Sequence, residues 1–275
     1  MGMLCCMRKI QVVKTFRLSY KIDATSCMRL IQRNILLFAI SLALVSCGSN
    51  AGLPGNLTKD YDWNTPFTSN CPLPNSNSVV WMSEGKRRFA RMTLLDGDKG
   101  GCTADKVARH SAPYWERAEL KQSGTLDKNE LYTIDVTLRF VKGFGGERET
   151  FFQVHAYNDS CKQAYPPVMI QFDNTNSSAA VLTLQALQSN GHHIGYKSDM
   201  RIENVLGKWI DLRLVVKLGE GSSATLYVDE KAIFNNIPIW VESCGTPHVK
   251  FGAYRPGNLS GSARSVVDFD SINVN

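Results

Sequence analysis

The chain has 275 residues and a formal net charge of +6. The excess is local: of 31 basic and 25 acidic residues, residues 1–46 hold seven and one, so the remainder carries 24 of each. A balanced charge excludes the broad positive field with which proteins bind nucleic acid. The remainder, about 230 residues, has a length common for one all-β sandwich or barrel.

Residues 28–46 have the layout of a secretory signal peptide, with a basic start, an apolar run and a small residue before Cys47. The apolar run, Ile35–Val45, is too short for a comfortable membrane span. Residues 44–47, Leu-Val-Ser-Cys, also resemble the bacterial lipobox, which implies that Cys47 becomes the lipidated first residue. An ordinary signal peptide with an incidental cysteine is the alternative. We expect a protein of the bacterial cell envelope, lipid-anchored in the outer membrane on its periplasmic or surface side, or else a secreted protein.

Residues 1–27 fit no part of this layout, and a start codon assigned too early, with Met28 the true start, explains them best. We therefore treat them as an untranslated or non-structural leader. Residues 47–60 are small and polar and contain proline and glycine, which indicates a tether. The folded domain is expected over residues 61–275.

Four cysteines lie in this domain, which in an exported protein allows two disulfides in three possible pairings. They are Cys71, Cys102, Cys161 and Cys244. Their spacing is not that of a zinc site, and we expect no metal. Residues 96–101, DGDKGG, predict a plain turn, because the later acidic ligands of a calcium loop are missing.

The domain is a succession of short apolar or alternating runs separated by Gly, Asn and Ser turns, with no helical period of ten residues or more. Loops are expected over residues 61–78 and 190–200. The pattern predicts an all-β fold, an antiparallel two-sheet β-jelly-roll sandwich of the concanavalin A type. Strands are expected over residues 79–82, 88–94, 114–122, 131–141, 151–158, 168–172, 181–188, 209–218, 224–228, 250–254 and 265–274.

Three of these strands carry unusual polar faces. Alternation in FFQVHAYN, residues 151–158, places Gln153, His155 and Tyr157 on one face, which suggests a concave surface for a polar ligand. A solvated face that includes one histidine is the alternative. Residues 248–257 place Lys250, Gly252 and Tyr254 together; the glycine serves either close approach of a ligand or a bulge. The strand over residues 114–122 groups Arg117, Glu119 and Lys121.

These strands resemble, in the same order, the signature strands of jelly-roll polysaccharide lyases of the alginate lyase superfamily. The motifs are RAEL at residues 117–120, QVH at 153–155 and KFGAY at 250–254. Residues 207–219, GKWIDLRLVVKLG, and the strand after them look more like the group of heparin lyase I and glucuronan lyase. The resemblance covers most of the chain from Val79 onward.

The resemblance implies an enzyme that cleaves a uronic-acid polymer by β-elimination, without a cofactor. It assigns His155 and Tyr254 to catalysis, Tyr254 as acid and in one version also as base. Arg117 and Gln153 would neutralise the substrate carboxylate, with His155 as a further donor, and Lys250 would bind a second carboxylate or lower the pKa of the tyrosine. The expected partners are an acidic polysaccharide and, through the lipid anchor, a membrane; the protein is expected to be a monomer.

Alginate is the first choice of polymer, and glucuronan or another glucuronate-containing glycan the second. The departures are Ala118, where the alginate lyases carry Ser or Thr, and Arg255-Pro256, where they carry Asn-Gln. A non-catalytic carbohydrate-binding module is the alternative from another class. A hydrolase is disfavoured, because Glu119 is interpreted as the ion-pair partner of Arg117 and no second acid lies in either of the other signature strands.

Other residues are given lesser roles. If His155 lies opposite Lys250 on neighbouring antiparallel strands, the same register brings Cys161 near Cys244, which leaves Cys71 to pair with Cys102. His192 and His193 are expected in a solvated loop, and His248 at a strand end. Arg255 is expected on the opposite face from Tyr254. The tryptophans Trp115, Trp209 and Trp240 are expected mostly in the core.

Overall fold

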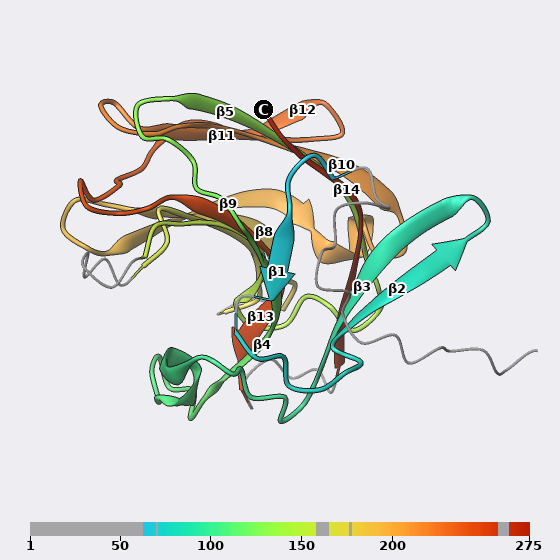
Figure 1. The fold of residues 1–275 in the computed structure, drawn as a ribbon. Helices are drawn as coiled ribbons and strands as arrows, with labels where there is room; N and C mark the ends of the chain where they lie inside the picture. The colour runs from blue at the N-terminus through green and yellow to red at the C-terminus, as the bar shows by residue number, and fades with distance from the viewer. Residues whose placement is uncertain (1–62, 70, 158–164, 176–177, 258–263) are drawn as a thin grey trace, which may run out of the picture. The chain divides into compact units, whose positions relative to one another are not determined.

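The computed structural model describes residues 63–69, 71–157, 165–175, 178–257 and 264–275. These residues form two seven-stranded sheets, in which every pairing between strands is antiparallel (Figure 1). The fold confirms the predicted all-β, two-sheet jelly roll. The predictions for the leader, the signal peptide, the lipidation at Cys47 and the tether lie outside the described residues.

Sheet 1 contains the three strands with polar faces. Its order is β1 (Phe67–Ser69), β4 (Trp115–Gln122), β13 (His248–Pro256), β6 (Glu149–His155), β7 (Val168–Asp173), β8 (Val181–Leu187) and β9 (His193–Arg201). Sheet 2 has the order β12 (Lys231–Pro238), β11 (Ser223–Val228), β10 (Trp209–Lys217), β5 (Leu131–Phe140), β14 (Arg264–Val274), β3 (Arg87–Leu95) and β2 (Val79–Glu84). Two short 3₁₀ turns in this part of the chain are η1 (Thr103–Lys106) and η2 (Ile202–Asn204).

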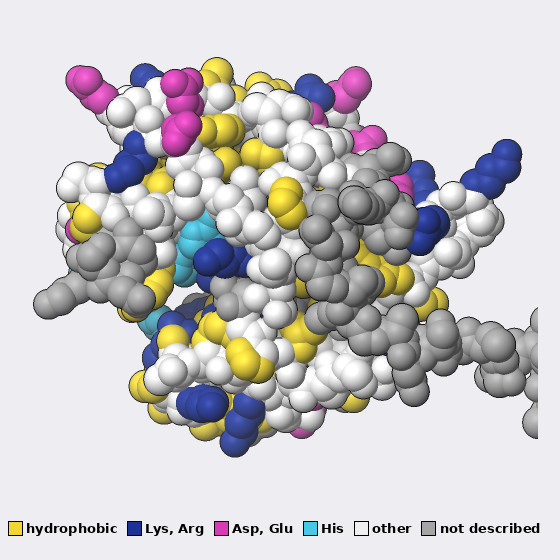
Figure 2. Space-filling model, in the orientation of Figure 1, with side chains coloured by type: hydrophobic (Ala, Val, Ile, Leu, Met, Phe, Trp, Pro, Cys, Tyr) yellow, Lys and Arg dark blue, Asp and Glu magenta, His cyan; other side chains and the backbone are white. Residues whose placement is uncertain are grey.

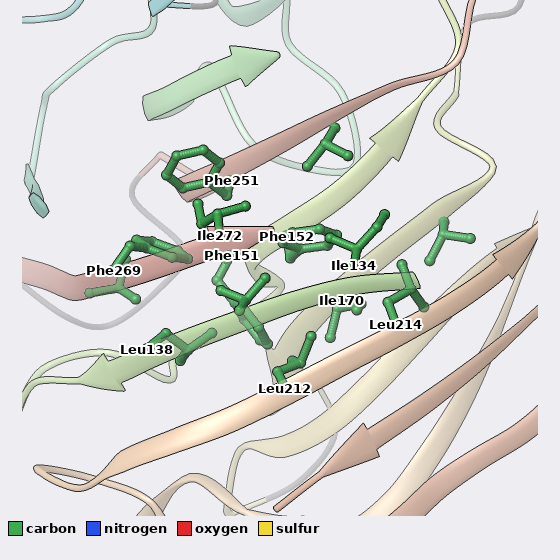
Figure 3. Packing of buried hydrophobic residues seen from close by; sticks show 14 of the residues in the cluster. Ile134, Leu138, Phe151, Phe152, Ile170, Leu212, Leu214, Phe251, Phe269 and Ile272 are labelled. Carbon is green, nitrogen blue, oxygen red and sulfur yellow. The ribbon is translucent and has the colours of Figure 1, made fainter. Parts of the chain in front are cut away.

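The core lies between the sheets, where the apolar face of each strand meets the other sheet. Figure 3 shows Phe152 of β6 and Phe251 of β13 meeting side chains of β5, β10 and β14. Both phenylalanines are fully buried, and burial of a side chain of this size contributes roughly 1.5–3 kcal/mol. This packing holds the opposite, polar face of sheet 1 on a rigid support.

A bulge in β6 brings two consecutive phenylalanines into the core. Strict alternation places Phe151 on the polar face with Gln153, but it is buried, with its ring 4.8 Å from that of Phe140. The pairing with β7 shifts between Thr150 and Phe152, so one extra residue is accommodated and Phe151 turns inward.

The structure also contains strands that the sequence did not predict. Residues 190–200 were expected as a loop, but His193–Arg201 is β9, the edge strand of sheet 1. Edge strands β1 and β12 were missed as well. β1 has only three residues, and the pairing of β12 is interrupted by register shifts. In β9, Tyr196, Ser198 and Met200 do alternate with exposed residues, but the strand begins in a histidine- and glycine-rich stretch that resembles a loop.

The predicted disulfide between Cys71 and Cys102 is present, with a Cα–Cα distance of 5.3 Å. Cys244 is disulfide-bonded too, but Cys161 lies outside the described residues, so that pairing stays a prediction. Residues 96–101 form a turn in which the Asp98 carboxylate accepts the Leu95 N–H at 2.9 Å. Within the described ranges, no three His, Cys, Asp or Glu side chains are grouped as metal ligands would be. No helix among the same residues is long and apolar enough to cross a membrane.

Candidate active site

The three motif strands are neighbours in sheet 1, in the order β4, β13, β6. Arg117 of β4 lies opposite Tyr254 of β13, and Lys250 of β13 lies opposite Gln153 of β6. All five predicted site residues therefore share one surface, which we call the site face: the side of β4, β13 and β6 that points away from the core. Figure 2 shows a hollow in this view of the molecule where histidine and Lys or Arg side chains gather.

The predicted register was wrong by two residues. His155 pairs with His248, not with Lys250, and Lys250 pairs with Gln153. A shift of two residues exchanges neighbours along a strand but keeps every side chain on its face, because the side-chain period of a strand is two. The site residues therefore stay together although their cross-strand partners differ.

Tyr254 is held on three sides. Its ring stacks on that of Trp115, with centroids 4.9 Å apart. The guanidinium carbon of Arg117, from the neighbouring strand β4, lies 4.1 Å from the centroid of the Tyr254 ring. Arg109, from the segment after η1, donates a hydrogen bond from Nη2 to the phenol oxygen. Burial raises the pKa of Tyr254 to about 12, although Arg117 and Arg109 oppose the rise. The resting side chain is therefore a neutral phenol at pH 7, a proton donor.

Arg117 is bound by two carboxylates. Asp105 of η1 accepts from Nε and Nη2 at 2.8 and 2.7 Å, and Glu119 accepts from Nη1. Burial by itself would lower the pKa of Arg117, but Glu119 and Asp105 hold it above its ordinary value. The predicted pair with Glu119 is confirmed, whereas Asp105 was not foreseen. With both acids ionised, this group of three side chains carries no surplus positive charge.

Gln153 is also tied to Glu119. Its amide nitrogen donates to the second carboxylate oxygen at 2.5 Å, so Glu119 links β4 to β6 across β13. A carboxylate only accepts hydrogen bonds, so the amide oxygen of Gln153 must point the other way. The bond leaves Gln153 one N–H and one carbonyl oxygen for other partners.

Lys250 is a cation of the site face that has no partner among the described residues. Its side chain is buried, and no hydrogen bond or ion pair joins its ammonium to another described residue. Burial lowers the pKa of Lys250 to about 8, with Glu119 opposing the shift and Arg117 and Lys121 adding to it. At neutral pH the group is still mostly protonated, so a buried positive charge without a partner is available to an anionic ligand.

His155 stacks on His248, with ring centroids 5.5 Å apart. Nδ1 of His155 accepts the Tyr157 backbone N–H at 3.0 Å, whereas Nδ1 of His248 lies 2.9 Å from the Thr246 carbonyl and must donate to it. Burial lowers the pKa of His155 well below its usual range and that of His248 to about 4, so both rings are neutral at pH 7. Neutral His155 therefore carries its proton on Nε2, and His248 presents a lone pair there.

Gly252 serves a bulge. Its φ is +145°, and the pairing of β13 with β6 shifts between Phe251 and Tyr254. A Cβ at this position would lie 2.2 Å from the Ala118 carbonyl oxygen of the neighbouring strand. Position 252 therefore needs a glycine because the backbone of β4 leaves no room for a side chain there. Close approach of a ligand is not needed to explain the glycine.

Four residues of the site were missed or misjudged from the sequence. Asp105 and Arg109 come from a segment without strand pattern, so no sequence signal placed them. His248 does begin β13, as expected of a strand-end residue, but its place on the site face was not foreseen, although the period of two through Lys250 and Tyr254 points to it. Trp115 is buried, as expected, but in a small separate cluster with Ala112 and Tyr254, so its contact with the site was not foreseen.

Two secondary predictions can be compared with the structure. Arg255 does lie on the opposite face, fully buried and paired with Glu116 at 2.5 Å and with Glu149 at 3.3 Å. His193 is not in a loop; it begins β9, and its Nε2 lies 2.8 Å from the Pro166 carbonyl oxygen. The catalytic and binding roles of the site residues stay predictions.

The chain resembles known polysaccharide lyases in fold. Alginate lyase A1-II′, a member of polysaccharide lyase family 7, superposes with a TM-score of 0.53 at 16% identity, over 73% of this chain and 84% of that one. An alginate lyase from Pseudomonas aeruginosa gives 0.52 at 14% identity, over 76% and 97%. An endo-β-1,4-glucuronan lyase from the fungus Trichoderma reesei gives 0.52 at 14% identity, over 76% and 94%.

No curated protein matches the chain. A family model described as polysaccharide lyase, however, matches residues 73–273. This range includes β4, β6 and β13 and nearly all of both sheets. The match covers well over half of the sequence, and the chain therefore belongs to this polysaccharide lyase family.

Proposed function

We propose that the protein cleaves a uronic-acid polymer by β-elimination on the site face. The observation that carries the proposal is the position of Lys250, a buried ammonium without a partner among the described residues, on the same face as a neutral histidine and a buried phenol. A polyanion supplies the missing counter-charge, and a lyase needs a proton donor and acceptor beside it.

Such a site must first neutralise the carboxylate next to C5 of the sugar, because the C5 proton is not acidic beside a full negative charge. Three donors on the site face meet this requirement, namely the Lys250 ammonium, Nε2–H of His155 and the remaining amide N–H of Gln153. Arg117 is already compensated by Asp105 and Glu119, so it supports Tyr254 more than it binds substrate. This differs from the role that the family resemblance implies.

The site must then transfer two protons. The C5–H bond breaks as a base takes the proton, its electron pair forms the C4–C5 double bond, and the C4–O4 bond breaks as O4 receives a proton. Tyr254 is a neutral phenol at rest, which suits it to protonate O4. For the C5 proton the base would be Tyr254 itself: once its phenol proton has been lost to solvent, the phenolate accepts the C5 proton and returns it to O4, while His155, which carries its proton on Nε2, remains the donor to the carboxylate.

Alginate is the first substrate to test and glucuronan the second. The solved neighbours include lyases named for each polymer, and alginate lyase A1-II′ has been solved in complex with a product, GGG, and a substrate, GGMG. Ala118 and Arg255-Pro256 depart from the alginate lyase motifs, so glucuronan stays the second candidate substrate.

The test is near-ultraviolet absorbance of the purified protein mixed with a panel of uronate polymers, since elimination creates a conjugated double bond in each product. Tyr254→Phe should lower kcat about 10²- to 10⁴-fold, the range of general acid–base catalysis, and His155→Ala should lower it as well. Arg213→Met, on the outer face of sheet 2, is the matched control. Retention on a polymer without any absorbance change would support the carbohydrate-binding alternative instead.

We also propose that the mature protein is anchored to the bacterial envelope through lipid on Cys47. The lipobox-like Leu-Val-Ser-Cys after a signal-like segment supports this. Labelled fatty acid fed to the producing cells should appear on the wild-type protein and be absent from Cys47→Ser. Equal labelling of both would refute the anchor.

A further inference from the structure

The segment after η1 forms a tight hairpin at the edge of the site face. Arg109 and Ala112 exchange two backbone hydrogen bonds of 3.0 Å each, and the two residues between them, His110 and Ser111, have φ of 50° and 67°. Such left-handed values favour glycine and asparagine, so this turn stores strain. Strain of this kind persists where the surrounding structure determines it and concentrates at functional sites.

The hairpin aims the Arg109 side chain at Tyr254. The guanidinium lies over the Trp115 ring at 4.8 Å, Nη2 is 3.8 Å from Asp105, and the same nitrogen donates to the phenol oxygen. Nε is buried and has no hydrogen-bond partner among the described residues. Arg109 thus contacts the oxygen that would carry the proton, and its own charge is only loosely compensated.

We propose that Arg109 is a positioning residue for Tyr254: it holds the phenol oxygen in place and supplies the positive charge that the phenolate requires. The catalytic part of this proposal rests on the proposed function, because it matters only if Tyr254 transfers protons. The electrostatic part is a property of the folded protein and can be measured without substrate.

Arg117 does not fill this role by itself. It faces the ring of Tyr254 and is held by two carboxylates, whereas Arg109 contacts the oxygen. The charges that act on Tyr254 are Asp105 from η1, Arg109 from the hairpin, and Arg117 and Glu119 from β4. On β6 the residue opposite Tyr254 is the uncharged Thr150.

Two cations and two carboxylates therefore balance around the phenol, and Lys250 lies four residues away on the same strand. Removal of Arg109 leaves the phenolate facing a surplus of negative charge. Loss of an opposite charge at this range moves a pKa by about 1–3 units.

The test uses full-length protein with a fluorotyrosine at position 254, whose more acidic phenol titrates in an accessible pH range and reports by ¹⁹F NMR. Arg109→Gln should raise the pKa of this phenol by about 1–3 units, whereas Arg109→Lys, which keeps the charge, should restore most of the difference. Arg213→Met, far from the site on sheet 2, should leave it unchanged. Circular dichroism confirms folding, and Arg109→Met replaces Arg109→Gln if that variant does not fold.

An unchanged pKa in Arg109→Gln would overturn the proposal, as would equal shifts in the Gln and Lys variants, which would indicate shape instead of charge. For the catalytic part, kcat of Arg109→Gln should fall at least about tenfold with KM nearly unchanged, and its pH profile should move toward higher pH. If the wild type cleaves no polymer but the pKa shift is present, the proposed function fails while the electrostatic role of Arg109 stands.

Discussion

Replacing Gly252 by alanine should cost the protein a large part of its stability even without any ligand. The φ of +145° is almost exclusive to glycine, and holding another residue there costs about 1–3 kcal/mol. The new Cβ would meet the Ala118 carbonyl oxygen at 2.2 Å, Glu119 Cα at 2.7 Å and Met92 Sδ at 2.9 Å. Two of these atoms belong to the backbone of β4 and cannot rotate away, which adds overpacking of about 1–3 kcal/mol.

The expected loss for Gly252→Ala is therefore about 2–6 kcal/mol. Urea unfolding followed by tryptophan fluorescence measures it, and with a slope of about 2 kcal/mol per M the midpoint should fall by about 1–3 M. Gly124→Ala is the matched control, because no atom lies within 4 Å of its added Cβ and its φ is not positive. That variant should change stability by less than about 1 kcal/mol.

If Gly252→Ala unfolds at the same urea concentration as Gly124→Ala, the packing argument is refuted. A stable Gly252→Ala that no longer binds polymer would instead show that the glycine serves the approach of a ligand, the alternative left open by the sequence.

Two further predictions concern charge. Because burial lowers the pKa of Lys250 to about 8, substrate affinity should be full below that pH and should fall as the pH rises through it. Lys250→Met should weaken binding and abolish this pH dependence of KM. A wild-type KM that stays constant from pH 7 to 9 would contradict the prediction. Asp105→Asn removes one of the two carboxylates that bind Arg117, which stays paired with Glu119, and should cost about 1–3 kcal/mol in urea unfolding. Asp135→Asn, in a surface pair with Arg213, should cost about 0–1 kcal/mol, and equal losses would refute the argument.

The fold was largely predictable because most strands bury one face. Trp209–Lys217 and Leu131–Phe140 alternate clearly and were recognised almost to the residue. His193–Arg201 was not, because it begins in a histidine- and glycine-rich stretch typical of a loop, although Tyr196, Ser198 and Met200 alternate with exposed residues. Local sequence reports burial well and reports edge pairing poorly.

The sequence predicted which face of each strand carries the site residues, but not their contacts. Alternation alone placed Gln153 with His155 and Lys250 with Tyr254, and neither a two-residue register error nor the bulge at Gly252 removed them from that face. The same rule failed for Phe151, because the bulge in β6 is set by pairing with β7.

The sequence by itself determined which side chains lie on the polar face of each strand, because a strand's period of two is a local property. Only the tertiary structure decided what surrounds them. It brought Asp105 onto Arg117 and Arg109 onto Tyr254 from a segment without periodic pattern, and it left Lys250 without a partner among the described residues. These contacts depend on how a disulfide-linked loop packs against a sheet, and the pKa values depend on burial, so neither can be derived from residue order.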